Sequence, residues 1–281
     1  MKDCAGPKVG LALSGGGARG LAHIGVLKVL EQDRVPIDLL AGTSMGGIVA
    51  AGYAAGLTPR HLEHEALQMT RPRRLLSLAD PTLPRRGLFE GQKIVSYLAS
   101  QLGECTFEDL RCPLSLLAVD LRDGRSITLS QGRVIEAVRA TIALPGLFTP
   151  VEREGRLLVD GGLLDNIPTG VVRDMGADIV IAVDVVGGNG TFSAMVHRMR
   201  RHRYVPDGLA STIEVMFRSL DVMMGEINRR RLEDAAPDII IRPDVPSGVS
   251  VLVGFSRAGD TIAAGERAAI EALPRIRALL K

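Results

Sequence analysis

A Gly-x-Ser-x-Gly motif, Gly42 to Gly46, constrains the fold of this chain more than any other stretch. An apolar run at 35–41 comes before the motif, and an uncharged run rich in Ala, Gly and Ile follows at 45–57. This context predicts a buried strand, a sharp turn and a helix. A serine between two glycines at such a turn is typical of a nucleophile elbow, where bulkier flanking residues would collide with neighbouring backbone. The motif therefore places Ser44 at the positive end of the following helix.

The stretch from Leu39 to Pro59 is uncharged, and about 20 apolar residues would suffice to cross a bilayer. Its glycines, with Thr43 and Ser44, favour a buried strand, turn and helix over a membrane span. The first ten residues lack the charged-then-apolar pattern of a signal peptide. The three cysteines have no framework spacing, which fits free thiols in a reducing compartment. We therefore expect a cytoplasmic protein.

Composition excludes some classes of partner. Aromatic residues make up only 3% of the chain and Trp is absent, which argues against binding of single-stranded nucleic acid. The net charge of +2 is too small to imply a polyanionic partner for the whole protein, so any basic character must be local. We expect no nucleic-acid partner.

The order of apolar and helical patterns indicates the fold class. Short apolar runs predict buried strands at 9–14, 35–41, 113–121, 157–160, 179–184 and 239–242, with a hairpin turn at Asp123-Gly124 into 126–129. Helical patterns occur at 21–31, 45–56, from 58 onward, 91–102, 134–141, 193–231 and 257–280, whereas 71–87 reads as a loop. Alternating strands and helices predict an α/β fold with a mostly parallel sheet. We expect one domain over 1–281, with a core at 9–184 and a helical, C-terminal extension at 187–281.

A glycine loop follows the first predicted strand, and Gly15, Gly17 and Gly20 satisfy the Gly-x-Gly-x-x-Gly pattern of dinucleotide-binding proteins. That interpretation requires an acid about 20 residues further on, at the end of the second strand. Asp33 precedes the second strand and Asp38 stands at its start, while the serine motif occupies the required place. The dinucleotide hypothesis is therefore the weaker one.

The same loop can serve as an oxyanion hole. Acyl transfer creates a negative oxygen that preorganised N–H donors stabilise. Consecutive glycines allow backbone amides to converge on one point, and a helix beginning near Ala18 adds its positive end. Because this loop and the serine motif each follow an early strand, both could open onto the same face of the sheet.

A serine nucleophile needs a general base, usually a histidine. The histidines occupy positions typical of surface or packing residues; they are His23, His61, His64, His197 and His202. Asp160 ends a predicted strand before Gly161-Gly162, which places a carboxylate at the carboxyl edge of the sheet. An aspartate has an ordinary pKa of ~3.9, which burial raises and hydrogen bonds to the charged form lower. A direct Ser–Asp dyad and a turn carboxylate that caps local amides both remain open.

These elements together resemble the patatin-like phospholipase family, in particular small bacterial proteins similar to the neuropathy target esterase domain. The resemblance rests on the loop 15–20, the motif 42–46 and Asp160-Gly161-Gly162, with further matches at 144–150 and 165–168. It covers about 9–184.

The resemblance implies a three-layer α/β/α sandwich that hydrolyses acyl lipids without a metal or cofactor. It implies Ser44 as nucleophile and Asp160 as base of a Ser–Asp dyad. The implied oxyanion hole is formed or supported by Gly15, Gly16, Gly17 and Arg19. The expected substrates are phospholipids, lysophospholipids or related acyl esters. A lipid-binding or regulatory protein with little turnover is the alternative on the same fold.

Two basic segments combine arginines with apolar residues, at 71–86 and 197–203. Such patterning suits contact with an anionic lipid surface, although charge runs are commonly just solvated. We expect peripheral contact with the inner face of a membrane.

Overall fold

The computed structural model describes residues 6–82, 87–187, 207–250 and 253–281. Its centre is an eight-stranded sheet in which strands bond in the order β10-β9-β1-β2-β4-β8-β7, with β5 also paired to β4. The strands are β1 (Val9–Leu13), β2 (Leu39–Thr43), β4 (Leu114–Asp120), β5 (Arg125–Leu129), β7 (Val151–Arg153), β8 (Arg156–Asp160), β9 (Ile179–Val183) and β10 (Ile239–Ile241). Neighbours from β10 through β4 are parallel, whereas β5, β8 and β7 are each antiparallel to their partner. The largely parallel sheet expected from the sequence is confirmed.

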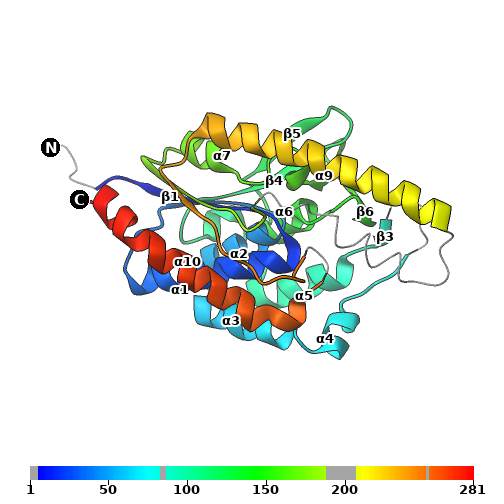
Figure 1. Ribbon diagram of the computed structural model, residues 1–281, viewed down its shortest axis with the longest axis horizontal. Coiled ribbons are helices and arrows are strands. Elements are labelled where there is room, and N and C mark those ends of the chain that lie inside the picture. The colour runs from blue at the N-terminus through cyan, green and yellow to red at the C-terminus, as the bar shows by residue number, and fades with distance from the viewer. Residues whose placement is uncertain (1–5, 83–86, 188–206, 251–252) are drawn as a thin grey trace.

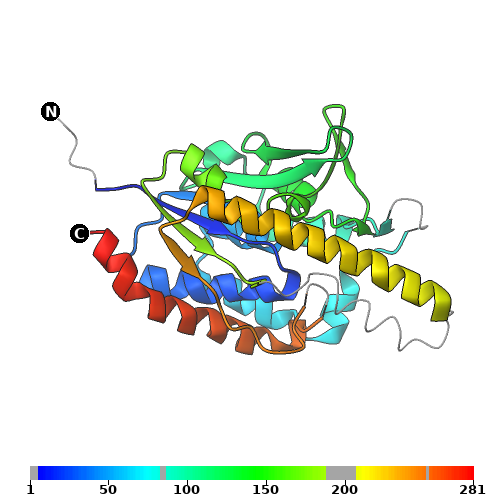
Figure 2. The ribbon, with the colours of Figure 1, turned by 45° about the horizontal axis from the view of Figure 1, so that its top comes forward.

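Helices cover both faces of the sheet, which completes the predicted α/β/α sandwich (Figure 1). One face carries α1 (Ala22–Gln32), α2 (Met45–Ala54), α3 (Pro59–Gln68), α5 (Gln92–Leu102), α6 (Val134–Thr141) and α10 (Ala258–Leu279). The other carries α7 (Thr169–Asp174) and the long helix α9 (Asp207–Ala235), which crosses the molecule in Figure 2. The short helix α4 (Pro72–Ser77) lies at one end, near a separate parallel pair, β3 (Gly87–Phe89) and β6 (Gly146–Phe148).

The alternation of side chains in β1 explains why the two faces differ. Val9, Leu11 and Leu13 point into the larger core, which α1 and α10 cover. Ala12 points to the opposite face, into a smaller cluster with Val172 of α7. A Cβ at Gly10 would lie 1.9 Å from a methyl carbon of Val172, so only glycine lets α7 pack this closely. The small residues of β1 thus set the position of α7 and of the loop before it.

The C-terminal helix α10 packs tightly on α1. A Cβ at Gly25 would lie 2.0 Å from the carbonyl oxygen of Ile262, and one at Gly265 would lie 1.9 Å from that of Ala22. Arg277 also forms an ion pair with Asp33 at the end of α1. Residues 258–279 therefore contribute directly to the main core.

Some sequence-based boundaries are wrong for identifiable reasons. The second strand begins at Leu39 rather than at 35, because the Val35 N–H bonds back to Leu30 and Pro36 has no N–H to donate. The segment 71–87, predicted as a loop, contains α4 and the start of β3; a proline at the first helical position after an extended Arg71 initiates α4. The helix predicted from 193 is described only from Asp207, and 197–203 lies outside the described residues.

Within the described ranges, no helix combines the length and apolar character that a membrane span requires.

Candidate active site

Ser44 occupies a sharp turn between β2 and α2. Its backbone has φ 53° and ψ −122°, a region that residues other than glycine rarely adopt. The Ser44 N–H donates to the Thr141 hydroxyl at 2.9 Å, and that hydroxyl donates to the carbonyl of Leu117. The Ser44 carbonyl accepts the N–H of Ile48 and so starts α2. Strain of this kind costs roughly 1–3 kcal/mol and persists only where the surroundings enforce it.

The flanking glycines leave no room for side chains. A Cβ at Gly42 would lie 2.7 Å from the carbonyl oxygen of Gly46, and a Cβ at Gly46 would lie 2.4 Å from that of Leu13. Both contacts are with backbone, which cannot move aside as a flexible side chain can. The geometry is that of the nucleophile elbow predicted from the sequence.

The register of β4 brings Asp160 to Ser44. Strand β5 pairs along Leu116 to Asp120 and therefore occupies one edge of β4. On the other edge, β2 pairs along 114–117 and ends with Thr43 opposite Leu117. Antiparallel β8 pairs along 118–120 on that same edge and ends with Asp160 opposite Ala118. The carboxyl ends of β2 and β8 thus meet head to head. As expected, Asp160 ends a strand and lies beside the carboxyl end of β2, although β8 runs antiparallel to β4 and not parallel with the rest of the sheet.

The Asp160 carboxylate is 3% exposed. It accepts the Gly162 N–H at 2.9 Å. Burial raises the pKa of Asp160 to about 6, against the opposing effect of the nearby Ser44 hydroxyl and of the Gly162 N–H. A Cβ at Gly161 would lie 2.6 Å from the Leu117 carbonyl oxygen, so this position also excludes a side chain. Near neutral pH the carboxylate is mostly ionised and can accept the Ser44 proton.

The glycine loop runs beside Ser44, but only part of it can act as an oxyanion hole. The Gly15 N–H donates to the Asn166 carbonyl at 3.1 Å, and the Ala18 N–H donates to the Ser250 carbonyl at 3.2 Å. Among the described residues, the N–H groups of Gly16 and Gly17 have no hydrogen-bond acceptor. Gly17 has φ 56°, which suits glycine, and it lies on the wall of the cavity that also exposes Ser44. These two amides are the candidate oxyanion donors, whereas Gly15 anchors the loop.

Arg19 supports the loop from the side. Its Nε donates to the carbonyl of Val249 at 3.0 Å. Burial lowers the pKa of the half-buried Arg19, and the carboxylate of Asp221 on α9 partly opposes this shift. The side chain thus connects the glycine loop to segment 249–250 and to α9.

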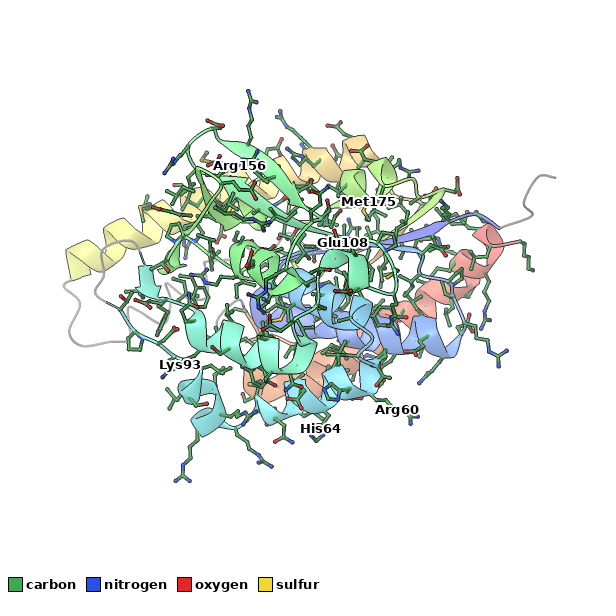
Figure 3. The ribbon with its side chains drawn as sticks, turned by 180° about the vertical axis from the view of Figure 1, so that it is seen from behind. Arg60, His64, Lys93, Glu108, Arg156 and Met175 are labelled. Atoms are coloured by element: carbon green, nitrogen blue, oxygen red, sulfur yellow. The ribbon has the colours of Figure 1, made fainter. Side chains whose placement is uncertain are left out.

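The described histidines serve packing or surface roles. His23 is fully buried under the glycine loop, where its Nε2 donates to the Ser14 carbonyl at 2.7 Å. Burial lowers the pKa of His23 to about 4, so the ring is neutral near pH 7. His61 bonds Gln101 at 3.1 Å, and His64 lies on the outer face of α3 (Figure 3). His197 and His202 lie outside the described residues.

The two candidates for the acid that a bound dinucleotide would require, Asp33 and Asp38, are engaged elsewhere. Asp33 pairs with Arg277, and the Asp38 carboxylate accepts the Val9 N–H at 2.7 Å. Neither carboxylate stands at the carboxyl end of β2, where Ser44 follows Thr43. The arrangement offers no ribose-binding acid at that point.

A cavity of about 490 Å³ opens beside Ser44. Its described lining comes mainly from α1 to α6 and from β3 and β6, with Gly17, Leu21 and Phe255 from the adjoining segments. Nearly all of it is apolar; Glu65, Tyr97 and Gln101 are the polar side chains besides Ser44. Tyr97 donates to Glu65, and the guanidinium of Arg74 lies 5.3 Å from the centre of the Tyr97 ring. Burial, with Glu65 nearby, raises the pKa of Tyr97 to about 12, so its hydroxyl stays protonated. Such a cavity can hold a hydrocarbon chain with one end at Ser44.

Sequence reasoning missed Thr141, Asn166 and Asn228. Thr141 holds the Ser44 backbone from a distant helix, and no local pattern marks it. Asn166 belongs to the matched stretch 165–168 but received no role. Asn228 of α9 accepts the Asn166 N–H at 2.7 Å, a contact across 62 residues that only the fold reveals.

The fold and the site define a class: three-layer α/β/α proteins with a serine at a strained elbow beside a buried aspartate. A family model described as patatin-like phospholipase matches residues 11–173. The chain belongs to this family.

Similar proteins agree with this assignment. An uncharacterized NTE family protein of Mycobacterium tuberculosis is 38% identical over 187 residues, covering 66% of this chain and 51% of that protein. A second uncharacterized NTE family protein of Mycobacterium tuberculosis is 33% identical over 287 residues, covering 96% of this chain and 48% of that protein. Patatin-like phospholipase domain-containing protein 6 of Mus musculus is 37% identical over 186 residues, covering 64% of this chain and 14% of that protein. The chain thus spans about half the length of the mycobacterial relatives.

The crystal structure of VipD from Legionella pneumophila is similar in fold. It aligns with a TM-score of 0.51 at 17% identity, covering 96% of this chain and 67% of that one. At this identity the likeness concerns the fold alone.

Proposed function

We propose that the protein is a serine acyl hydrolase that cleaves fatty acyl esters of phospholipids, lysophospholipids or related lipids. One observation carries the proposal: Ser44 stands at a strained elbow beside buried Asp160, and this elbow opens into an apolar cavity. Membership of the patatin-like phospholipase family supports the lipid class of the substrate.

In the proposed mechanism, Asp160 accepts the hydroxyl proton as Ser44 Oγ attacks the ester carbonyl. The N–H groups of Gly16 and Gly17 bind the negative oxygen of the tetrahedral intermediate, aided by the positive end of α2. The bond to the leaving alcohol then breaks, and that alcohol takes the proton from Asp160. Water next gives a proton to Asp160 and attacks the acyl-serine, which releases the fatty acid and returns the proton to Ser44 Oγ.

The raised pKa of Asp160 supports its role as the base. A carboxylate with the ordinary aspartate pKa of ~3.9 accepts a proton weakly near neutral pH. A pKa of about 6 lies closer to the working pH, where a general base is most effective. No histidine is required in this scheme.

Contact with a lipid surface through segment 71–86 forms part of the proposal. In its described portion Arg71, Arg73 and Arg74 are exposed, and so are Leu75 (38%) and Leu76 (71%). Both leucines also line the cavity, so the apolar surface of α4 continues into the site. Basic residues beside exposed leucines suit an anionic bilayer from which an acyl chain enters.

A fluorophosphonate probe combined with an ester panel tests the proposal. The probe should label Ser44, and Ser44→Ala should lose both labelling and hydrolysis, whereas Ser130→Ala at an exposed serine should retain both. A folded wild-type protein that hydrolyses no phospholipid, lysophospholipid or short-chain ester would instead favour the lipid-binding or regulatory alternative.

A further inference from the structure

Asn166 fills the space between the glycine loop and the turn after Asp160. Its carbonyl accepts the Gly15 N–H at 3.1 Å, and its side-chain Nδ2 donates to the Gly15 carbonyl at 3.4 Å. Its Oδ1 would lie 2.4 Å from a Cβ at Gly15 and 2.9 Å from one at Gly162. A side chain at either position would therefore displace the Asn166 side chain from its place. One side chain thus contacts the oxyanion loop and the turn that bonds Asp160.

Asn166 is itself held by α9. The Asn166 N–H donates to Oδ1 of Asn228 at 2.7 Å. One turn further along α9, the Arg231 guanidinium donates to the Asp165 carboxylate at 3.2 Å. The Asp165 carbonyl also accepts the hydroxyl of Thr43, the residue before Ser44. Segment 165–166 is thus tied to α9 on one side and to both catalytic loops on the other. Helix α9 lies beyond the residues that the family model matches.

We propose that Asn166 and Asn228 are positioning residues, through which α9 sets the geometry of the oxyanion loop. The kinetic consequence rests on the proposed function. The chain of contacts runs from Asn228 through Asn166 to Gly15, whose neighbours Gly16 and Gly17 carry the two candidate oxyanion amides. Loss of the Asn228 acceptor leaves the Asn166 N–H unpaired, so this segment shifts and the two amides leave their places with it.

The test removes the acceptor while it keeps the shape of the side chain. Asn228→Leu has a similar volume but no acceptor, whereas Asn228→Asp keeps an oxygen for the Asn166 N–H. Arg230→Gln is the matched control, because Arg230 is exposed on the same helix and pairs with Glu226. We expect kcat on a soluble ester to fall about tenfold or more in Asn228→Leu, less than the ~10²–10³ lost with a deleted oxyanion donor. KM should stay within about twofold, since the cavity is unchanged.

Hydrogen exchange of the amides at 14–18 provides a readout that does not depend on turnover. Exchange there should accelerate in Asn228→Leu and match the wild type in Asn228→Asp and Arg230→Gln. If the wild type hydrolyses no ester, the proposed function fails, but the exchange comparison still decides the positioning role. Wild-type exchange at 14–18 in Asn228→Leu overturns the proposal. So does an equal loss of kcat in Asn228→Asp, or faster exchange spread evenly over the whole chain.

Discussion

The elbow at 42–46 and the rim formed by α4 border the same cavity, yet they are built in opposite ways. At the elbow, backbone atoms of β1, β2 and α2 approach so closely that Gly42 and Gly46 admit no side chain. At α4, leucines that line the cavity are also exposed to solvent, Leu76 by 71%. The comparison teaches that the proposed reacting groups lie where the backbone has no freedom. In the proposed function, the acyl chain would instead contact the protein where side chains can adapt.

The same contrast appears in the charges. Asp160 is enclosed and accepts the Gly162 N–H, so its protonation depends on its fixed surroundings. The arginines of α4 are exposed, and salt screens such charges within about 8–10 Å. Catalysis should therefore respond to single atoms at the elbow, whereas contact with lipid should respond to ionic strength at the rim.

The largest expected effect comes from Asp160→Asn, which keeps the shape of the side chain but cannot accept the proton. We expect kcat to fall by about 10²–10⁴. In the wild type, kcat/KM should drop about tenfold per pH unit below the Asp160 pKa of about 6 and level off above it. Asp123→Asn, at the hairpin turn, is the control. A collapse after a single change of His23, His61 or His64 to Gln, with Asp160→Asn still active, would contradict the dyad.

A second prediction concerns the rigidity of the elbow. Gly46→Ala places a methyl group against the Leu13 carbonyl, so it should destabilise the fold by about 1–3 kcal/mol or more. Gly225→Ala, in α9 with open space around the added carbon, should be neutral or stabilising by roughly 0.5–1 kcal/mol. Chemical denaturation of both variants measures the difference. Equal stability of the two would show that the elbow is not close-packed.

A third prediction follows from the cost of burying the Asp160 charge. Its pKa is about 6 in the folded protein and ~3.9 when unfolded, so the folded state binds the proton more tightly. The stability linked to this proton is fully present below pH 4 and is lost as pH rises through 6. Asp160→Asn should therefore exceed the wild type in stability by roughly 1–3 kcal/mol at pH 8, with little difference at pH 4. A destabilised variant at pH 8 would contradict this account.

The smallest effect is expected at the rim. Leu76→Ser should reduce hydrolysis of anionic lipid vesicles several-fold, since about 25 cal/mol is lost per Å² of apolar contact. Hydrolysis of a soluble short-chain ester should not change. Ile270→Ser removes another exposed apolar side chain (57%), from α10, and should affect neither substrate. A matching loss on the soluble ester would place Leu76 in the catalytic machinery. It would contradict the proposed division between a catalytic elbow and a lipid-contacting rim.

The sequence predicts the elbow well because the constraint there is local. Glycines on both sides of Ser44, between an apolar run and a helical run, identify the turn without knowledge of the rest of the fold. The glycine loop is predictable as a loop, but the sequence does not predict that the Asn166 carbonyl accepts the Gly15 N–H. Sequence pattern cannot assign that bond, because the partner is 151 residues away.

The direction of β8 and the helix α4 were beyond sequence reasoning for physical reasons. A short apolar strand reads the same in either direction, so its sequence does not predict that β8 pairs antiparallel with both β4 and β7. In 71–87, prolines and arginines indicate a loop, yet Pro72 is compatible with the first turn of a helix. The prediction of a single domain stays a prediction.

The most direct test of the central claim is capture of the acyl-enzyme. Rapid acid quench during turnover of a fatty acyl ester, followed by peptide mass spectrometry, should find one acyl group on the peptide that contains Ser44. The same quench of Ser44→Ala should find none. An acyl group on another residue, or active hydrolysis with no covalent adduct under burst conditions, would contradict the account.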